Sequence, residues 1–266
     1  MKKKAISLIP LIILVSIWEA LSYFQKDFSV FFSSPSRIAT LLFKELFHGD
    51  ILVHTLITAY EAFAGLVLGL VVGCSIGFSL IYFPKYSKIA YPYVVALSAI
   101  PTFALAPLMI IWFGTGLQMK IILSFLATVF TTAFQAYEGA QKVATSDKIF
   151  FDLNHASNKQ RFWMLSFPVS IDWVIQSLKL NAGFCILGAF IGEFIASEAG
   201  LGYIILKASG LYDTTYVFVA ILCIILLSSV FSFFASIINK HKLRIIRAII
   251  QLVLSGENKS VNSKTK

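Results

Sequence analysis

Six stretches of this sequence are apolar over a length that approaches or reaches the thickness of a lipid bilayer. A helix needs about 20 apolar residues to cross the roughly 30 Å of a hydrocarbon core. The stretches lie near residues 5–23, 57–82, 90–113, 119–139, 174–196 and 215–238. Because 58% of all residues are hydrophobic, more than a water-soluble protein buries or exposes safely, we predict an all-α integral membrane protein. About six transmembrane helices would form a single transmembrane domain over residues 1–266.

The basic residues of the loops indicate how these spans are oriented. With an even number of spans and the N-terminus inside, 17 of the 22 lysines and arginines fall on the cytoplasmic side. We therefore expect a multi-pass protein of the cell inner (plasma) membrane with cytoplasmic N- and C-termini, the latter a basic tail over 239–266. The net charge of +9 then reflects orientation, and no aromatic-basic motif points to nucleic acid.

Between the first two spans, the sequence SPSRIATLLFKELF has the features of a separate short helix. Ser34 and Pro35 form a typical helix start, and Ile38, Leu41 and Leu42 recur at helical spacing. We predict an external helix on the bilayer surface, and we favour a connector over a substrate-docking element.

The second span carries four glycines, each four residues after the last. They are Gly65, Gly69, Gly73 and Gly77. Glycines at this spacing fall on nearly one stripe of a helix and let a second helix approach closely. The stripe predicts close helix packing, within the subunit or at a subunit interface, and we favour packing within the subunit.

Two prolines interrupt the third span, in SAIPTFALAPLMIIWFG. Pro101 and Pro107 each remove a backbone donor and disfavour the α conformation of the preceding residue. We expect a kinked or locally opened helix, which lipid tolerates only where protein or water satisfies the freed carbonyls. Pro101, Phe103 and Pro107 are therefore predicted to lie on the translocation pathway. The alternative is a structural kink without contact to the cargo.

One acidic residue, Glu193, follows a long apolar run in GAFIGEFIASEAGLGY. Charge inside a membrane is costly enough to make such a residue a functional candidate. Glu193 is thus a second candidate for the translocation pathway, and the alternative is capping or pairing at the external end of the fifth span. We expect another acidic residue, Glu61, to reach a membrane interface.

A hydrophilic segment over 141–172 separates the fourth and fifth spans on the predicted cytoplasmic side. Ser146 is a candidate N-cap, followed by Asp147 in the first helical turn. Apolar residues then recur at three- and four-residue spacing, namely Ile149, Phe150, Leu153 and Ala156. A short amphipathic helix of this kind fits a hydrophobic groove on a soluble partner. The alternative is a helix that lies on lipid headgroups.

The rest of this segment predicts a second helical piece. Asn154, Ser157 and Asn158 favour a break, and the new helix is expected to begin at Lys159. Pro168 is expected to mark the turn into the fifth span.

Nearly the whole chain resembles the membrane permease subunits of ATP-binding-cassette (ABC) importers, in the branch associated with nitrate, sulfonate, taurine and related small nutrients. The resemblance is carried by SPSRIATLL, IPTFALAPLMIIWFGTGLQMK and GEFIASEAGLGYIILKASGLYDTTYVF. It implies a type I ABC importer permease architecture with a cytoplasmic coupling helix.

In such permeases the cytoplasmic loop before the fifth span has Glu-Ala-Ala, a Gly four residues later, and a Pro thirteen residues after that Gly. Pro168 matches, whereas His155 stands at the Gly position and Ile149, Phe150 and Phe151 stand at the Glu-Ala-Ala positions. The resemblance implies that this loop contacts the ATPase. The coupling residues would be Phe150, Phe151, Asp152, Leu153, Asn154, His155, Ala156 and Ser157.

The same resemblance implies the partners: a second permease in a dimer, ABC ATPase subunits inside, and an extracytoplasmic solute-binding protein outside. We predict no cofactor in this chain and ATP on the partner subunit, because the sequence contains no GxxxxGK[ST]. We predict no catalytic residue and no metal site either, since the four histidines form no HExxH motif. The alternatives are an ion-gradient-driven secondary transporter, disfavoured by the scarcity of midspan charges, and a membrane enzyme.

Overall fold

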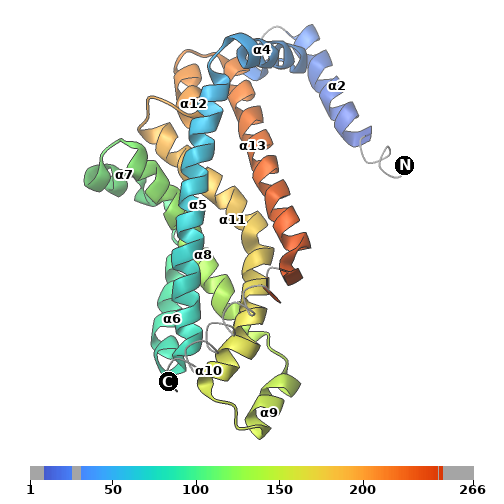
Figure 1. Cartoon of the computed structure of the whole chain (residues 1–266). Coiled ribbons are helices and arrows are strands. Elements are labelled where there is room, and N and C mark those ends of the chain that lie inside the picture. Colours follow the sequence, from blue (N-terminus) through green and yellow to red (C-terminus); the bar gives the residue numbers. More distant parts are fainter. Residues whose placement is uncertain (1–8, 26–30, 245, 248–266) are drawn as a thin grey trace, which may run out of the picture. The chain divides into compact units, whose positions relative to one another are not determined.

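The computed structural model describes residues 9–25, 31–244 and 246–247, and in these ranges every regular element is a helix (Figure 1). Residues 5–8 of the first expected span lie outside the described residues. So do Lys2, Lys3 and Lys4, on which part of the orientation argument rests, and residues 248–266 of the basic tail.

The chain divides into two compact units. The first comprises residues 1–60 and 190–227, and the second comprises 61–189 and 228–266. Three long helices begin in one unit and end in the other: α5 (Ile51–Tyr82), α11 (Phe167–Ile195) and α13 (Thr214–Lys240). Among the described residues, the first unit has one of the buried apolar clusters, and the second unit has two.

The first unit also contains α2 (Ile9–Phe24), α4 (Pro35–His48) and α12 (Leu201–Gly210). Helix α4 begins as its sequence predicts, with Pro35 in the first turn and the Ser34 Oγ accepting a hydrogen bond from the Arg37 N–H at 3.3 Å. Apolar residues from α4, α5, α12 and α13 form the core of this unit: Ile38, Ile51, Leu201, Ile204, Ile205, Val219, Ala220 and Cys223.

A carboxylate joins α2 to α4 in the same unit. Glu19, on α2, accepts hydrogen bonds from the Ser36 N–H at 3.0 Å and from the Ser36 Oγ at 2.7 Å. An acidic group is favoured at this end of α4, where the first backbone N–H groups have no partner within the helix.

The second unit adds α6 (Pro84–Ser98), α7 (Thr102–Phe113), α8 (Leu117–Gln141), α9 (Thr145–Leu153) and α10 (Asn158–Arg161). Helix α8 packs against α6 and α7 and runs beside α5 in Figure 1. A π-helical turn, Phe162–Ser166, joins α10 to α11, so that Asn158–Ile195 is one helical run of 38 residues.

Four of the six expected spans lie in helices that are long and apolar enough to cross a membrane. These are α5, α8, the run Asn158–Ile195 and α13. The described part of the first expected span is α2, with 16 residues, which is shorter than a full span.

The third expected span, 90–113, is two helices rather than one. Helices α6 and α7 are bent by 92° at the short break between them. Pro101 is the N-cap of α7, and the chain leaves α6 just before it, because proline lacks the N–H that would continue the helix. Pro92 and Pro107 lie inside α6 and α7 without ending them, so only Pro101 produces the break.

The polar segment 141–172 differs from expectation at two points. Helix α9 begins at Thr145 after Ala144, so Ser146 lies inside the first turn and is not the N-cap. Pro168 marks no turn, because the helix runs through it. The π-helical turn ends at Ser166, two residues before Pro168, and is the kind of local widening that accompanies a residue without a backbone donor.

Candidate functional site

Helix α9 presents apolar side chains without burying any of them. None of its residues is buried, and the side chains of Phe150 and Leu153 are 62% and 75% exposed. In Figure 1 this short helix lies beyond the end of α8, set off by loops on both sides. Of the other predicted coupling residues, Phe151 and Ala156 are half-buried and the rest are exposed.

The end of α9 is a Schellman motif built around His155. His155 has a φ of 50°, and its N–H donates to the Asp152 carbonyl at 3.1 Å. The Ala156 N–H reaches back to the Phe151 carbonyl at 3.0 Å. These two bonds satisfy the last carbonyls of the helix, and the motif usually has glycine at the left-handed position. His155 therefore adopts the left-handed backbone conformation that glycine usually adopts at this position of the motif.

The loop after His155 is closed by side chains from the next helix. The Arg161 guanidinium pairs with the Asp152 carboxylate, and its Nε donates to the Ala156 carbonyl at 3.0 Å. Ser157 and Gln160 form a reciprocal capping box at the start of α10. Sequence reasoning missed Arg161 and Gln160, although the spacing from Ser157 to Gln160 is a recognisable capping signal.

The glycine stripe of α5 lies against α8 of the same chain. A Cβ added at Gly69 would lie 2.0 Å from the Thr128 Oγ1, and one added at Gly73 would lie 2.5 Å from the Val129 carbonyl oxygen. A Cβ added at Gly65 would likewise overlap Ser124, and one added at Gly77 would overlap Ala136. The two helices approach so closely that any side chain at these positions would overlap α8.

A buried asparagine joins α8 to α11 in the same unit. Asn181 is fully buried; its Oδ1 accepts from the Thr131 Oγ1 at 3.0 Å and its Nδ2 donates to the Thr132 Oγ1 at 3.1 Å. Interhelical hydrogen bonds of this kind hold membrane helices together where the hydrophobic effect contributes little. The sequence signal was a polar residue directly before the apolar run over 182–192.

Glu61 is fully buried within the protein, and its expected reach to a membrane interface stays a prediction. Its carboxylate lies 3.4 Å from the Lys120 ammonium, and both side chains are buried between α5 and α8. A charge inside a membrane requires a partner of opposite sign, and here each residue is the partner of the other. The pairing was not predicted, because the two residues are far apart in the sequence.

Glu193 caps a helix in the first unit. Its carboxylate, fully buried, accepts hydrogen bonds from the Thr58 Oγ1 at 2.6 Å and from the Gly202 N–H at 2.8 Å. Gly200, with a φ of 105°, brings the backbone so close that a Cβ there would lie 2.1 Å from the carboxylate. Through the bond from Gly202, Glu193 caps the start of α12. This agrees with the alternative to a role in translocation, namely capping or pairing.

The other residues predicted for a translocation pathway lie in the second unit. Pro101, Phe103 and Pro107 are exposed on and before α7. Their role in translocation, like that of Glu193, stays a prediction. Among the residues that the structure describes, no three His, Cys, Asp or Glu side chains are placed to hold a metal ion.

Membrane-length helices joined by close glycine contacts and interhelical hydrogen bonds are the features of a multi-pass membrane protein. Residues 65–244 match the family described as the binding-protein-dependent transport system inner membrane component. The chain belongs to this family. It is a permease subunit of an ABC importer, a transport subunit and not an enzyme, and this membership implies an ATPase subunit and a binding protein as partners.

Similar proteins carry names of the same class. A probable ABC transporter permease protein of Haemophilus influenzae is 29% identical over 81% of this chain and 87% of its own length. The riboflavin transport system permease protein of Chloroflexus aurantiacus is 26% identical, over 89% of this chain and 88% of its own. The putative aliphatic sulfonates transport permease protein of Bacillus subtilis is 25% identical, over 87% and 84%.

A solved structure shares the fold. A chain of the MetNI methionine ABC transporter, in an inward facing conformation, matches with a TM-score of 0.60 over 75% of this chain and 95% of that one. The sequence identity is 17%, so this likeness concerns the fold alone. The expected all-α fold of an ABC importer permease is thereby confirmed.

Proposed function

We propose that two copies of this chain form the translocation pathway for a small organic nutrient, which an extracytoplasmic binding protein delivers. ATP is bound and hydrolysed on a separate ATPase subunit, and α9 docks on that subunit. The observation that carries this proposal is the exposed apolar face of α9, with Phe150 and Leu153 outside any core of the described residues. Relatives named for riboflavin and aliphatic sulfonates support a small organic cargo.

In this proposal α9 transmits movement of the ATPase to the membrane helices. An amphipathic helix inserts its apolar face into a groove of its partner. The ion pair of Asp152 with Arg161, and the bond from Arg161 to the Ala156 carbonyl, tie α9 to the helical run that begins at Asn158. Displacement of α9 therefore pulls on the start of that run.

The orientation is part of the proposal. The loop 141–172 and both termini lie in the cytoplasm, as the distribution of lysine and arginine predicts. Helix α4 then lies on the outer side, where the binding protein docks.

Cysteine cross-linking tests the docking. In a background with Cys74, Cys185 and Cys223 replaced by alanine, Leu153→Cys is treated with a bifunctional thiol reagent in the assembled transporter. We expect capture of the ATPase subunit. The control is Tyr212→Cys, which is even more exposed but lies on the proposed outer side and should capture none. A Leu153→Cys variant that never captures the ATPase contradicts the proposal.

Uptake into reconstituted vesicles tests the energy source. The permease, its ATPase and its binding protein are assembled in vesicles with ATP on the ATPase side. We expect uptake that requires ATP and persists when ion gradients are collapsed. Uptake that follows an ion gradient and ignores ATP would instead establish the secondary-transporter alternative.

A further inference from the structure

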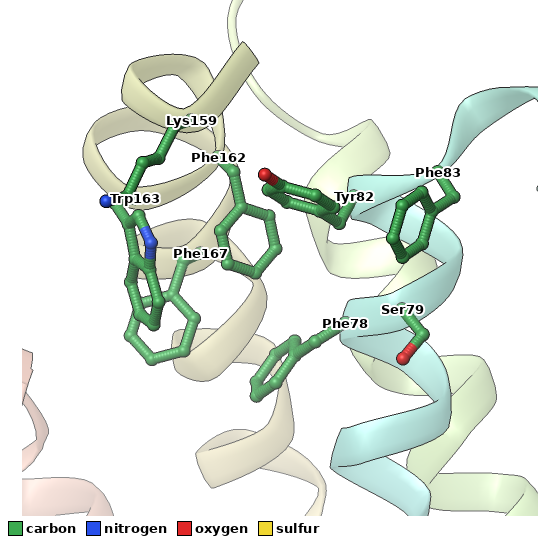
Figure 2. Close-up of a pocket in the computed structure, with 8 residues that line it drawn as sticks. All are labelled: Phe78, Ser79, Tyr82, Phe83, Lys159, Phe162, Trp163 and Phe167. Atoms are coloured by element: carbon green, nitrogen blue, oxygen red, sulfur yellow. The ribbon is translucent and has the colours of Figure 1, made fainter.

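An aromatic groove opens where α5 ends and the helical run Asn158–Ile195 begins, both within the second unit (Figure 2). Its volume is about 430 Å³. The residues that line it are Phe78, Ser79, Tyr82, Phe83, Lys159, Phe162, Trp163 and Phe167. Six of the eight side chains are aromatic, and none is acidic.

The aromatic walls are packed against one another and are therefore preformed. Phe78 contacts Phe167 with ring centroids 5.0 Å apart and Phe162 at 6.4 Å, and Tyr82 lies edge-on to Phe162 at 5.4 Å. These separations are those of favourable ring pairs. The Ser79 hydroxyl donates to the Ser75 carbonyl of its own helix at 2.7 Å, so it is engaged within α5.

Polar and apolar groups separate along the groove. Lys159, the Trp163 indole nitrogen and the Tyr82 hydroxyl lie toward one end, and Phe78 and Phe167 lie toward the other. Phe78 is one turn deeper in α5 than Tyr82, and Phe167 is one turn deeper in its run than Trp163. From Lys159 to Phe167 the helix rises by about 12 Å, most of the roughly 15 Å of one lipid leaflet.

We propose that this groove binds an anionic phospholipid, with the phosphate at Lys159 and an acyl chain along Phe78, Phe162 and Phe167. A cation and two hydrogen-bond donors at one end match a phosphate, and the absence of acidic side chains from the lining avoids repulsion. The aromatic walls provide an apolar surface for a hydrocarbon chain. A free soluble anion would make no favourable contact with them. Tyr and Trp are also the residues that occupy the boundary between headgroups and hydrocarbon.

Trp163 is a built-in reporter of this site. Replacing Trp18, Trp112 and Trp173 by phenylalanine leaves Trp163 as the single tryptophan of the chain. The assembled transporter is reconstituted in nanodiscs of phosphatidylcholine that contain a small, equal fraction of either brominated phosphatidylglycerol or brominated phosphatidylcholine. Bromine quenches indole fluorescence on contact. Both leaflets of a nanodisc have the same composition, so the result does not depend on the proposed orientation or transport function.

We expect brominated phosphatidylglycerol to be enriched about fivefold over brominated phosphatidylcholine at Trp163. This is the enrichment that the attraction between one lysine and an anionic lipid would produce. Lys159→Gln should remove this preference. Lys142→Gln should keep it, because Lys142 is not among the residues that line the groove. If the triple tryptophan variant does not fold, the difference in quenching between the native chain and Trp163→Phe supplies the same signal.

Three results would overturn the proposal. Equal quenching by the two brominated lipids would show no headgroup preference. Equal loss of preference in Lys159→Gln and Lys142→Gln would show a general charge effect. Protection of Trp163 from both lipids would show that a protein partner covers the groove.

Discussion

Some single residues in this permease have a backbone conformation or a buried charge that is unfavourable by itself. Hydrogen bonds from the surrounding residues stabilise them. His155 adopts a left-handed backbone at the end of α9, a conformation that costs a residue with a Cβ roughly 1–2 kcal/mol. Glu193 is a fully buried carboxylate that is satisfied by a hydroxyl and a backbone N–H. Each residue therefore allows a direct test of what holds its segment in place.

For His155 we compare two substitutions in the assembled transporter. His155→Gly should stabilise the end of α9 by about 0.5 kcal/mol, because relief of the left-handed strain exceeds the added freedom of the unfolded chain. His155→Val should destabilise it by about 1 kcal/mol, because a β-branched side chain is poorly tolerated at positive φ. Hydrogen exchange of the amides at positions 155 and 156 measures both effects. Equal protection in the two variants would contradict the Schellman geometry.

For Glu193 the test is its bond with Thr58. Glu193→Gln keeps the size of the side chain but removes its charge and turns one acceptor into a donor. The charge-assisted bond from the Thr58 hydroxyl is then replaced by a weaker neutral one, in which the hydroxyl accepts from the glutamine amide and donates to the His54 carbonyl, 3.2 Å away. We expect a loss of about 1–3 kcal/mol in the free energy of unfolding in detergent. Thr58→Ala and the double variant complete a thermodynamic cycle. A coupling energy near zero between the two positions would mean that the bond contributes nothing to stability.

At the scale of elements, close helix contact in the second unit depends on small residues and on a few buried polar bonds. The glycines of α5 allow backbone contact with α8, and Asn181 joins α8 to α11. Lipid tails are as apolar as leucine side chains, so surface complementarity and hydrogen bonds carry the association. The bend of 92° between α6 and α7 has a local cause instead, the missing backbone donor of Pro101.

The glycine contact predicts the outcome of a matched pair of alanine substitutions. Gly69→Ala places a methyl group on Thr128 of α8 and should lower the free energy of unfolding in detergent by about 1–3 kcal/mol. Gly183→Ala in α11 meets no atom within 4 Å and should stabilise the helix by up to about 1 kcal/mol. Unfolding titrations of both variants decide the matter. The packing explanation fails if Gly69→Ala is as stable as Gly183→Ala.

At the scale of the whole molecule, this chain is a permease subunit whose family implies an ATPase on another chain, and α9 is its proposed coupling element. The proposed mechanical link is short: α9, the Asp152 carboxylate, the Arg161 guanidinium and the helical run from Asn158. Because α9 buries none of its own residues, its position in the proposal rests on that link and on the docked ATPase.

Removal of the link should uncouple transport from hydrolysis. We expect Arg161→Ala to assemble with the ATPase but to lower the cargo moved per ATP hydrolysed roughly fivefold, within the range seen when coupling networks are broken. Lys88→Ala, in α6 and outside the loop, is the control. The ratio of uptake to phosphate release in reconstituted vesicles is the measurement. An unchanged ratio in Arg161→Ala would exclude this route of coupling.

Structural features that depend only on residues close together in the sequence could be predicted from the sequence. The start of α4 at Ser34 and Pro35, the break after Asn154 and the position of the polar segment follow from patterns within a few residues. Four of the expected spans coincide with membrane-length helices, because span length and apolar composition are local properties as well. The family resemblance was likewise visible in short sequence segments and is confirmed by the match over residues 65–244.

The sequence by itself determined that the chain is helical, lies in a membrane and carries an amphipathic helix between two spans. Only the tertiary structure decided which buried groups meet. Glu61 pairs with Lys120, and Glu193 meets Thr58, 135 positions away along the chain. The physical reason is that a buried polar group must be satisfied by whatever the packing brings beside it. Local periodicity determines which face of a helix is apolar, but it does not say which helix that face will meet.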